Sequence, residues 1–445
     1  MNSEIFKSYD IRGKYPEELT EKDAYAIGRA MALYIKGKNI AIGRDARPSS
    51  KPLFEAISKG ISDAGVNVLD LGLASTPMVY YASGESGVDG SICVTASHNP
   101  PPYNGFKLTK PNAVPIGGDS GLSEIKETAL HTQPKVGLIH GNIIPIRDLP
   151  VRYVEWLAGF WQLGDKKWSI VIDCANAMGV IELPAFKKVP ENITVTTLYD
   201  DLSHPFEAHE ANPLKTETLA ELSKKVIEVK ADLGISYDGD ADRIGFIDEN
   251  GTPVPMDLMT AILSAPVLKK YPKSTILYDL RSSLSVKEEI EKNGGTAHEC
   301  KVGHANIKKQ MREEESYFAG ELSGHYYFKE NSYAEASTLA AIFLLNHMSI
   351  TGKKLSELVA EVKKYFHTGE INNTVPEAKT VIEKLKEKYK DGVLSELDGI
   401  KISYPDWWFS VRSSNTEPLL RLNLEAKTKE LMEQKKEEVL LIIKS

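Results

Sequence analysis

The sequence predicts an α/β protein of four domains: three consecutive α/β domains with mixed, mainly parallel sheets, and a smaller C-terminal α+β domain. Its 445 residues are more than one hydrophobic core usually holds. Strand and helix patterns alternate over 1–148, 149–251 and 252–366, which is typical of βαβ units. Over 367–445 the pattern changes to closely spaced strands with few helices.

In the first domain, two helical patterns and three short apolar runs follow one another. The helices are predicted at 21–35 and 51–64, and the strands at 39–43, 66–70 and 91–94. The turns that contain Arg44 and Ser97 both follow strand ends. Because parallel strands end at the same edge of a sheet, we expect these two turns to share one rim.

The remaining domains are predicted from the same periodicities. In the second domain we expect a helix at 151–160 and strands at 168–173 and 232–236. In the third, which starts near Met256, we expect strands at 275–279 and 316–319. In the fourth we expect strands at 370–375, 400–404, 407–411 and 419–425, and helices at 381–389 and 428–444.

The composition excludes several classes of function. A formal net charge of −8 argues against a general nucleic-acid-binding protein. No apolar stretch reaches membrane-spanning length and the first residues lack the features of a signal peptide, so we expect a cytoplasmic protein. Three widely spaced cysteines are typical of reduced core thiols. The net negative charge of the protein would repel an anionic ligand, so Arg and Lys side chains in the loops would have to attract it.

The stretch Thr95-Ala96-Ser97-His98-Asn99-Pro100 is the first candidate for chemistry. It follows the apolar run 91–94, so Ser97 is expected at an exposed strand end, where α/β folds bind their ligands. A plain surface turn is the alternative. A serine hydrolase is disfavoured because the chain has no Gly-x-Ser-x-Gly elbow here, and because His98 would point away from Ser97 in an extended chain.

The loop Asp238-Gly239-Asp240-Ala241-Asp242 brings three carboxylates together after a strand. Their mutual repulsion favours a divalent metal, and oxygen ligands favour Mg²⁺. An EF-hand is disfavoured because Arg243 stands where that loop requires glycine, and because strand-like runs flank it. A phosphatase-type aspartyl nucleophile stays an alternative. Together with Ser97, the loop indicates phosphoryl transfer to or from an oxygen nucleophile.

With these loops the chain resembles the α-D-phosphohexomutase superfamily, specifically its phosphomannomutase/phosphoglucomutase branch. The resemblance covers the whole chain and rests on eight motifs in the family's order. They are Tyr9-Asp10-Ile11-Arg12-Gly13, Gly43-Arg44-Asp45-x-Arg47, Thr95 to Pro100, Asn104-Gly105-Phe106-Lys107, Asp238 to Arg243, Lys301-Val302-Gly303-His304, Gly320-Glu321-Leu322-Ser323-Gly324-His325 and Arg412-Ser413-Ser414-Asn415-Thr416-Glu417-Pro418.

The resemblance implies a heart-shaped, four-domain isomerase that interconverts the 1- and 6-phosphates of mannose or glucose. It implies Mg²⁺ as cofactor, phosphosugars as substrates, and hexose 1,6-bisphosphate as intermediate and activator. The four domains would carry, in chain order, the phosphoserine, metal-binding, sugar-binding and phosphate-binding loops. The intermediate would turn around in the cleft before returning its other phosphate to the serine.

The resemblance also implies the site residues. Ser97 would carry the phosphoryl group and, through it, bind the metal beside Asp238, Asp240 and Asp242. Lys107 and His304 are the two candidates for proton transfer, and the sequence does not separate acid from base. Further catalytic residues would be Arg12 and Arg243, and substrate would be bound by Tyr9, Glu321, Ser323, His325, Arg412, Ser414, Asn415, Thr416 and Arg421.

Other functions on the same fold remain alternatives. A phosphoglucosamine mutase is disfavoured because that branch usually has glycine at the position of Asn415. A non-catalytic phosphosugar-binding protein would be expected to lose Ser97 or a metal-binding aspartate, and all four are present. A phosphatase would release inorganic phosphate steadily. We expect the protein to be a monomer or a weak homodimer.

Overall fold

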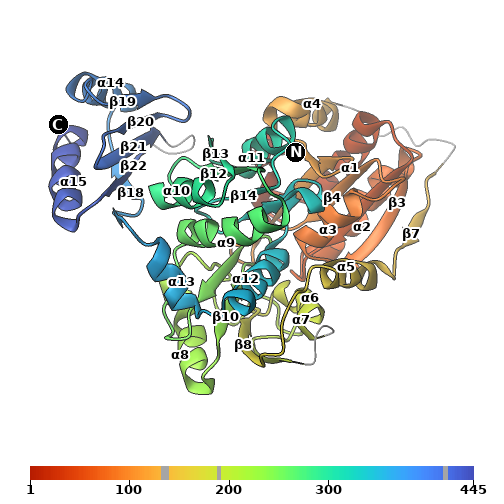
Figure 1. The fold of residues 1–445 in the computed structure, drawn as a ribbon. Helices are drawn as coiled ribbons and strands as arrows, with labels where there is room; N and C mark the ends of the chain where they lie inside the picture. The colour runs from red at the N-terminus through yellow and green to blue at the C-terminus, as the bar shows by residue number, and fades with distance from the viewer. Residues whose placement is uncertain (132–139, 188–191, 414–418, 445) are drawn as a thin grey trace.

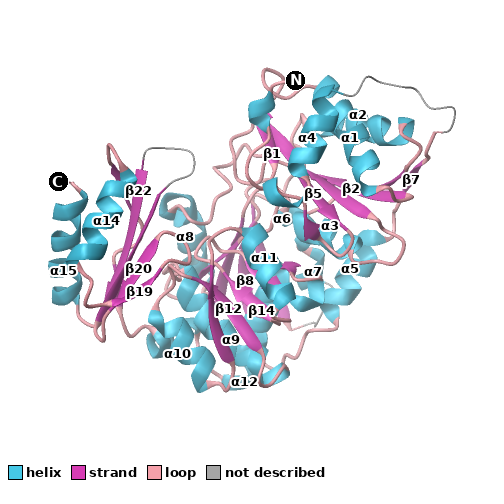
Figure 2. Cartoon of the chain, turned by 90° about the horizontal axis from the view of Figure 1, so that it is seen from above, coloured by secondary structure: helices cyan, strands magenta, loops and turns pink. Residues whose placement is uncertain are grey.

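The fold consists of four sheets that follow one another along the chain. The computed structural model describes residues 1–131, 140–187, 192–413 and 419–444 (Figure 1). The first and fourth sheets lie at opposite sides of the molecule, with the second and third between them, in both Figure 1 and Figure 2. The predicted fold class is therefore confirmed, whereas the boundaries at 148, 251 and 366 stay a prediction.

The first sheet is mixed, with the order β1-β5-β4-β2-β3-β7 and β6 paired to β5. β5 is antiparallel to both of its neighbours, whereas β4, β2, β3 and β7 run parallel. Its strands are β1 (Ile11–Lys14), β2 (Asn39–Arg44), β3 (Asn67–Leu73), β4 (Gly90–Val94), β5 (Tyr103–Lys110), β6 (Val114–Pro115) and β7 (Ile143–Pro145). Its helices are η1 (Ser3–Ile5), α1 (Glu21–Ile35), α2 (Ser50–Asp63), α3 (Thr76–Ser83), η2 (Gly118–Ser120) and α4 (Leu122–His131).

The second sheet has the order β11-β10-β8-β9. β10 is parallel to β8 and antiparallel to β11, so the acidic loop connects the two strands of a hairpin. Its strands are β8 (Trp168–Asp173), β9 (Ile193–Leu198), β10 (Leu233–Tyr237) and β11 (Ile244–Ile247). The helices are α5 (Leu149–Ala158), α6 (Gly179–Glu182), α7 (Pro184–Lys187), η3 (Thr216–Leu219) and α8 (Ala220–Val229).

The third sheet has the order β13-β12-β14-β15-β16 and is parallel from β13 to β14. Its strands are β12 (Thr275–Asp279), β13 (Thr296–Cys300), β14 (Phe318–Gly320), β15 (Tyr326–Phe328) and β16 (Ala334–Glu335). The helices are α9 (Met256–Lys270), α10 (Leu284–Lys292), α11 (His304–Glu313), η4 (Lys329–Asn331), α12 (Ser337–Thr351) and α13 (Leu355–Val362).

The fourth sheet is antiparallel throughout, with the order β17-β22-β21-β20-β19 and β18 paired to β22. Its strands are β17 (Phe366–His367), β18 (Ile371–Thr374), β19 (Val393–Ser395), β20 (Ile400–Ser403), β21 (Trp407–Ser413) and β22 (Leu419–Ala426). Two helices, α14 (Ala378–Lys388) and α15 (Lys429–Ile443), complete it.

The hydrophobic cores are divided unequally among the sheets. One continuous cluster joins the second and third domains and extends to α3 and β4 of the first. The fourth domain has a core of its own, formed by residues from Val375 to Ile443. The fourth domain is thus attached mainly through polar contacts, which makes it the part best able to move as a unit. No helix among the described residues is long and apolar enough to cross a membrane.

A buried carboxylate links the first three domains. Glu182, at the end of α6, accepts hydrogen bonds from the hydroxyls of Ser75, Tyr153 and Thr338, which lie in three different domains. Its side chain is fully buried, and burial raises its pKa above the usual value. The neutral form of Glu182 therefore persists to a higher pH in the folded protein than in the unfolded chain.

We expect Glu182→Ala to lower the thermal unfolding midpoint strongly, because the hydroxyls of Ser75, Tyr153 and Thr338 would stay buried without their acceptor. Together they would lower the free energy of unfolding by about 3 kcal/mol or more. Glu182→Gln should cost far less. The pKa of Glu182 is higher in the folded protein than in the unfolded chain. Its contribution to the free energy of unfolding is therefore complete below pH 4.5, and it is lost as the pH rises through the pKa that Glu182 has in the folded protein. The stability of the Gln variant relative to wild type should therefore increase from pH 5 to pH 8 in thermal unfolding. If the difference in stability between the Gln variant and wild type stayed constant over this pH range, the raised pKa of Glu182 would be contradicted.

Candidate active site

Three domains contribute to one polar cavity of about 330 Å³. Its lining includes two serines, two aspartates, two histidines and several cations. The lining residues are Lys7, Ser8, Tyr9, Asp10, Arg12, Ser97, Lys107, Asp242, Arg243, His304 and His325. Seven of them were predicted from the sequence as catalytic or substrate-binding residues: Tyr9, Arg12, Ser97, Lys107, Arg243, His304 and His325. An eighth, Asp242, was predicted as a metal ligand.

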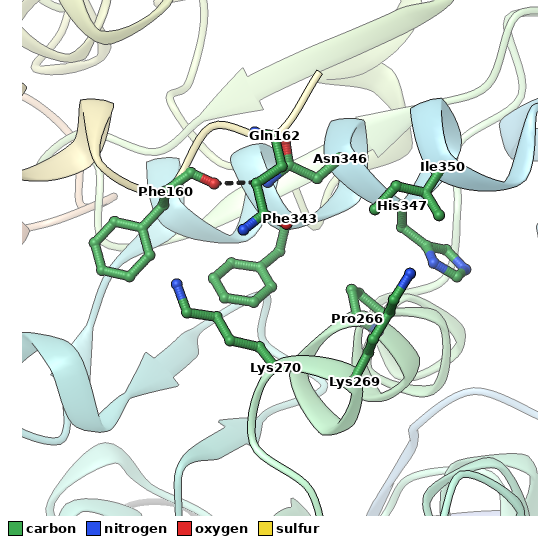
Figure 3. A pocket seen from close by; sticks show the side chains of 9 residues that line it. All are labelled: Phe160, Gln162, Pro266, Lys269, Lys270, Phe343, Asn346, His347 and Ile350. Atoms are coloured by element: carbon green, nitrogen blue, oxygen red, sulfur yellow. Dashed lines mark hydrogen bonds between the residues drawn. The ribbon is translucent and has the colours of Figure 1, made fainter. Parts of the chain in front are cut away.

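A second pocket, of about 230 Å³, lies between α9, α12 and the end of α5 (Figure 3). Phe160 and Phe343 form its apolar part, and the ammonium of Lys270 lies 4.4 Å from the ring centre of Phe160. None of the nine residues that line it carries a carboxylate or a hydroxyl. It therefore offers neither a hydroxyl that could carry a phosphoryl group nor carboxylates that could bind Mg²⁺.

Ser97 lies at the floor of the polar cavity, directly after β4. Its side chain is buried, with 3% of its surface exposed, which differs from the exposed serine that the strand end predicted. Its φ of 52° places it in the left-handed region, so the extended geometry assumed in the argument about His98 is not present at Ser97. The hydroxyl donates to Asp238 Oδ2 at 3.0 Å, and His98 Nδ1 lies 3.4 Å from Oγ. Burial and nearby cations lower the pKa of His98 to about 2, which leaves its ring neutral.

Arg47 holds the serine loop in this conformation. Its Nη2 donates to the carbonyl oxygens of Ser97 and Asn99, both at 2.7 Å, and its Nη1 donates to Pro100 O at 2.9 Å. Asp45 pairs with its Nε at 3.0 Å, and both side chains are fully buried. The predicted shared rim is therefore present, since the Asp45 N–H donates to Val94 O at the end of β4. The loop-forming role of Arg47 was not predicted, because its partners are backbone carbonyls about fifty residues away.

The three aspartates of the loop between β10 and β11 converge on one point. One carboxylate oxygen from each of Asp238, Asp240 and Asp242 lies within 4.8 Å of the others, and all three side chains are buried. The flanking strands exclude the helices of an EF-hand. Thr76 and Lys107 contribute from the first domain: the Thr76 hydroxyl donates to Asp240 Oδ2 at 2.5 Å, and its N–H donates to Asp240 O.

The aspartate group fits a hard divalent cation. Lys107 Nζ lies 2.6 Å from Asp240 Oδ2 and 2.5 Å from Asp242 Oδ2, so a positive charge already bridges two of the carboxylates. Among the described residues, Asp240 Oδ1 is buried without a hydrogen-bond donor, and Asp242 Oδ1 has only an ion pair with His325. Burial, together with the other two carboxylates, raises the pKa of Asp238 well above its usual value. A divalent cation would relieve this repulsion further than Lys107, Arg243 and His325 do, and buried carboxylate oxygens suit Mg²⁺.

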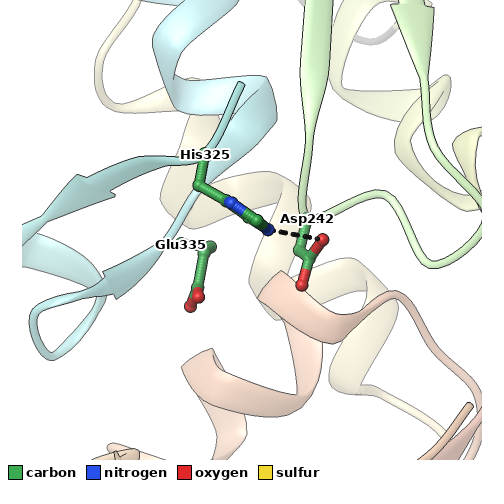
Figure 4. A group of neighbouring side chains, drawn as sticks. All are labelled: Asp242, His325 and Glu335. Atoms are coloured by element: carbon green, nitrogen blue, oxygen red, sulfur yellow. Dashed lines mark ion pairs between the residues drawn. The ribbon is translucent and has the colours of Figure 1, made fainter. Parts of the chain in front are cut away.

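His325 connects the aspartate loop to the third domain (Figure 4). Its Nε2 lies 3.3 Å from Asp242 Oδ1, and its Nδ1 lies 3.1 Å from Glu321 Oε2 and 2.7 Å from the hydroxyl of Ser323. Although burial lowers it, the charge of Asp242 raises the pKa of His325 to about 9. Glu321 and Ser323 belong to a turn, in which the Gly324 N–H donates to Glu321 O, and their side chains meet through His325.

His304 begins α11 and faces the cavity next to Tyr9, with the two rings 5.7 Å apart and edge to face. Burial, with the cations Lys308 and Lys107, lowers its pKa well below the usual value. Its imidazole is thus neutral and able to accept a proton. Arg12 lies on the other side of the cavity, where it donates to Asn99 Oδ1 at 2.9 Å and to Asp10 Oδ2 at 2.6 Å.

The predicted phosphate-binding loop is described in part. Arg412 and Arg421 lie opposite each other in the β21–β22 register. Both guanidiniums contact Glu370, at 3.6 Å. Ser414, Asn415 and Thr416 lie outside the described residues. The structure therefore brings together residues of the first three domains around one cavity. The arginines of the fourth domain are connected to this site through Glu370, Arg281 and Glu321.

Comparison with known proteins agrees with this arrangement. Phosphoglucomutase/phosphomannomutase α/β/α domains I, II and III match residues 3–134, 152–251 and 255–365, and the C-terminal domain of the same family matches 370–442. A phosphomannomutase of Methanocaldococcus jannaschii is 40% identical over 441 residues, which cover 98% of this chain and 96% of the relative. One of Escherichia coli is 35% identical over 450 residues, or 99% of both chains.

A solved structure gives the same result for the fold. A phosphoglucomutase/phosphomannomutase family protein from Burkholderia thailandensis superimposes with a TM-score of 0.91 at 29% identity, over 100% of this chain and 98% of the other. The chain belongs to the phosphoglucomutase/phosphomannomutase family. The predicted resemblance and the predicted enzyme class, a phosphohexomutase and therefore an isomerase, are confirmed with it.

Proposed function

We propose that the protein interconverts hexose 1-phosphate and hexose 6-phosphate of mannose or glucose, with Ser97 as the phosphoryl carrier. The observation that supports this most directly is the contact between Ser97 Oγ and Asp238 at 3.0 Å. It joins a hydroxyl nucleophile to a group of three buried carboxylates in a cavity lined by arginine, lysine and histidine. A phosphoryl group on Ser97 would meet both its metal and its counter-charges there.

Side chains of this protein account for the proton and the charge that move in the phosphoryl transfer. As the bond between phosphorus and Ser97 Oγ breaks, a bond forms from phosphorus to a sugar hydroxyl oxygen, and the proton of that hydroxyl must leave. We propose His304, which lines the same cavity, as the acceptor. Arg12 and Arg243, which line the same cavity, balance the negative charge of the phosphoryl group. After the bisphosphate has turned around, the Ser97 Oγ that was released as an oxyanion attacks its other phosphoryl group. The bond from that phosphorus to the second sugar oxygen breaks, and this oxygen takes the proton back from His304, which completes the isomerisation.

Asp238, Asp240 and Asp242 are the residues that we propose to hold Mg²⁺. When bound, the ion would neutralise charge on the phosphoryl oxygens, which makes phosphorus easier to attack. Glu321 and Ser323, oriented by His325, are proposed to bind neighbouring sugar hydroxyls. Since these hydroxyls are the same in glucose and mannose, we propose that both phosphosugars are substrates.

The function is tested by two measurements on the purified chain. Incubation with hexose 1,6-bisphosphate should place phosphate on Ser97, which is detected by mass spectrometry of the peptide that contains it. Initial rates on mannose 1-phosphate, glucose 1-phosphate and glucosamine 1-phosphate should be substantial for the first two and low for the third. Steady release of inorganic phosphate would indicate a phosphatase instead, and the absence of label on Ser97 would exclude the serine carrier.

For Arg412→Ala we expect KM for hexose 1-phosphate to rise about tenfold or more, since a guanidinium bond to a phosphate group is a charge-assisted bond. Arg412 lies in the fourth domain, away from Ser97, so phosphorylation of Ser97 by hexose 1,6-bisphosphate should still occur. KM comes from initial rates, and phosphoserine content comes from mass spectrometry. An unchanged KM would contradict the role of Arg412 in holding the phosphate that is not transferred.

A further inference from the structure

Glu370 stands at the centre of three guanidiniums. It lies between β17 and β18, which both pair with β22, so its backbone belongs to the fourth sheet. Its carboxylate oxygens lie 3.6 Å from Arg412 Nη2 and 3.6 Å from Arg421 Nη1. The third guanidinium, that of Arg281, comes from the third domain and lies 3.5 Å away. The fourth sheet lies beside the third domain in both Figure 1 and Figure 2.

The three arginines differ in how well they are paired. Arg281 is held by Asp279 in a bidentate pair, at 3.1 and 2.8 Å. Among the residues that the structure describes, Arg412 and Arg421 have only longer ion pairs, with Glu370 and, for Arg412, with Asp398 at 3.6 Å. Charge-assisted N–H···O bonds are normally about 2.7–2.9 Å long. Among the described residues, Arg412 Nη2 and Arg421 Nε are buried without a hydrogen-bond acceptor.

This cluster therefore contains two cations whose donors are only partly used. A carboxylate has two oxygens and one charge, and Glu370 divides them among three guanidiniums. A phosphate monoester offers three oxygens and up to two charges, and it satisfies a pair of guanidiniums better. Any phosphate that approaches Arg412 and Arg421 must also approach Glu370, which shares these cations and repels a dianion.

We propose that Glu370 is an internal competitor of the substrate phosphate, which neutralises Arg412 and Arg421 in the ligand-free protein and must give them up when phosphate binds. The proposal rests on the proposed function, in which these arginines bind the phosphate that is not transferred. Glu370 also contacts Arg281 across the domain boundary. Phosphate binding would thereby loosen one of the contacts between the third and fourth domains, at the time when the bisphosphate has to turn around.

The test is Glu370→Gln in the full chain, because glutamine keeps the size of the side chain and removes its charge. Inorganic phosphate is titrated by isothermal calorimetry, which requires no turnover. We expect binding about fivefold tighter than in wild type, in line with the loss of partly exposed ion pairs. KM for hexose 1-phosphate should fall by a similar factor without a rise in kcat. A role in merely holding the arginines in place predicts the opposite, weaker binding and a higher KM.

The matched control is Glu396→Gln, which removes one carboxylate from the same domain. Glu396 pairs with Lys386 at 2.6 Å and does not contact the arginine cluster. It therefore reports how a change in net charge alone affects phosphate binding. The gain in the Glu370 variant should exceed that of the control, and it should disappear when Arg412→Ala is added. Phosphate affinity equal to that of the control, or weaker, would overturn the proposal.

A second variant covers the case in which Glu370→Gln does not fold. Glu370→Asp keeps the charge, but its side chain is shorter by one methylene. Its carboxylate therefore lies farther from the three guanidiniums, which are already 3.5–3.6 Å from Glu370. Phosphate should bind more tightly to it than to wild type, by a smaller factor, and unchanged or weaker binding would again overturn the proposal. If phosphate affinity shifts as expected but neither variant nor wild type isomerises a hexose phosphate, the proposed function fails and the competition stands.

Discussion

Ser97→Ala is expected to abolish the isomerase activity, with a fall in kcat of at least about 10³-fold, because loss of a covalent nucleophile removes the pathway and not only a contact. Binding should change little, since the Ser97 side chain is small and its hydroxyl contacts mainly Asp238. Initial rates measure the first effect. Titration with hexose 1-phosphate by calorimetry measures the second.

A neighbouring serine provides the control for this variant. Ser91 lies on β4, the strand that precedes Ser97, is buried like Ser97, and shares a 2.6 Å hydrogen bond with Thr109. Ser91→Ala also removes one buried hydroxyl, but at a distance from the cavity lining. It should retain most of the activity of wild type. Near-normal turnover in Ser97→Ala would refute the nucleophile assignment, whatever the stability of either variant.

The parts of the fold that the sequence predicted well are those whose causes are local. The helix at Glu21–Ile35 was predicted with its observed bounds, because Thr20 and Asp23 form a capping box and the apolar face repeats every three to four residues. The strands Trp168–Asp173 and Thr275–Asp279 are apolar runs next to loops. The Ser97 and Asp238 loops directly follow such runs, so their positions at strand ends could be predicted too.

The elements that were missed depend on distant partners. β5 was not predicted, because Asn104, Gly105 and Lys107 are poor strand formers by propensity. It is stabilised instead between β1 and β4, and Asn104 donates to the hydroxyls of Ser49 and Ser50. That insertion brings Lys107 to the aspartate loop, at a distance of more than 130 residues in sequence.

The same reason limits what could be predicted of the site. Nothing in the local sequence distinguishes Arg47 or Glu370 from a surface charge, since their roles arise only where the serine loop and the third domain approach them. The left-handed φ of Ser97 was not predicted, because such a φ is rare for serine and is imposed here by the carbonyl contacts of Arg47. The motifs predicted which residues lie in the site. The contacts and backbone conformations that place them there could be seen only in the structure.

Asp240→Asn is expected to weaken Mg²⁺ binding by at least about tenfold. Mutation of residues that only hydrogen-bond to a metal ligand already lowers metal affinity by about that factor, and Asp240 is proposed as a ligand itself. The substitution reduces three neighbouring negative charges to two, and it replaces the Oδ1 or Oδ2 of a buried carboxylate with an amide nitrogen that cannot bind a cation. Calorimetric titration of the full chain with MgCl₂ measures the affinity directly. The Mg²⁺ concentration required for half-maximal activity should rise in parallel.

Asp232→Asn is a suitable control, because it removes one carboxylate from the same domain, where Asp232 pairs with Lys166 and accepts from the Ser169 N–H. It should leave Mg²⁺ affinity unchanged. The informative alternative concerns Lys107, whose ammonium already bridges Asp240 and Asp242. If Asp240→Asn had the same Mg²⁺ affinity and the same metal dependence as wild type, Lys107 would be the permanent counter-ion of this loop. The aspartates would then position a lysine beside the phosphoserine, and the metal assignment would be wrong.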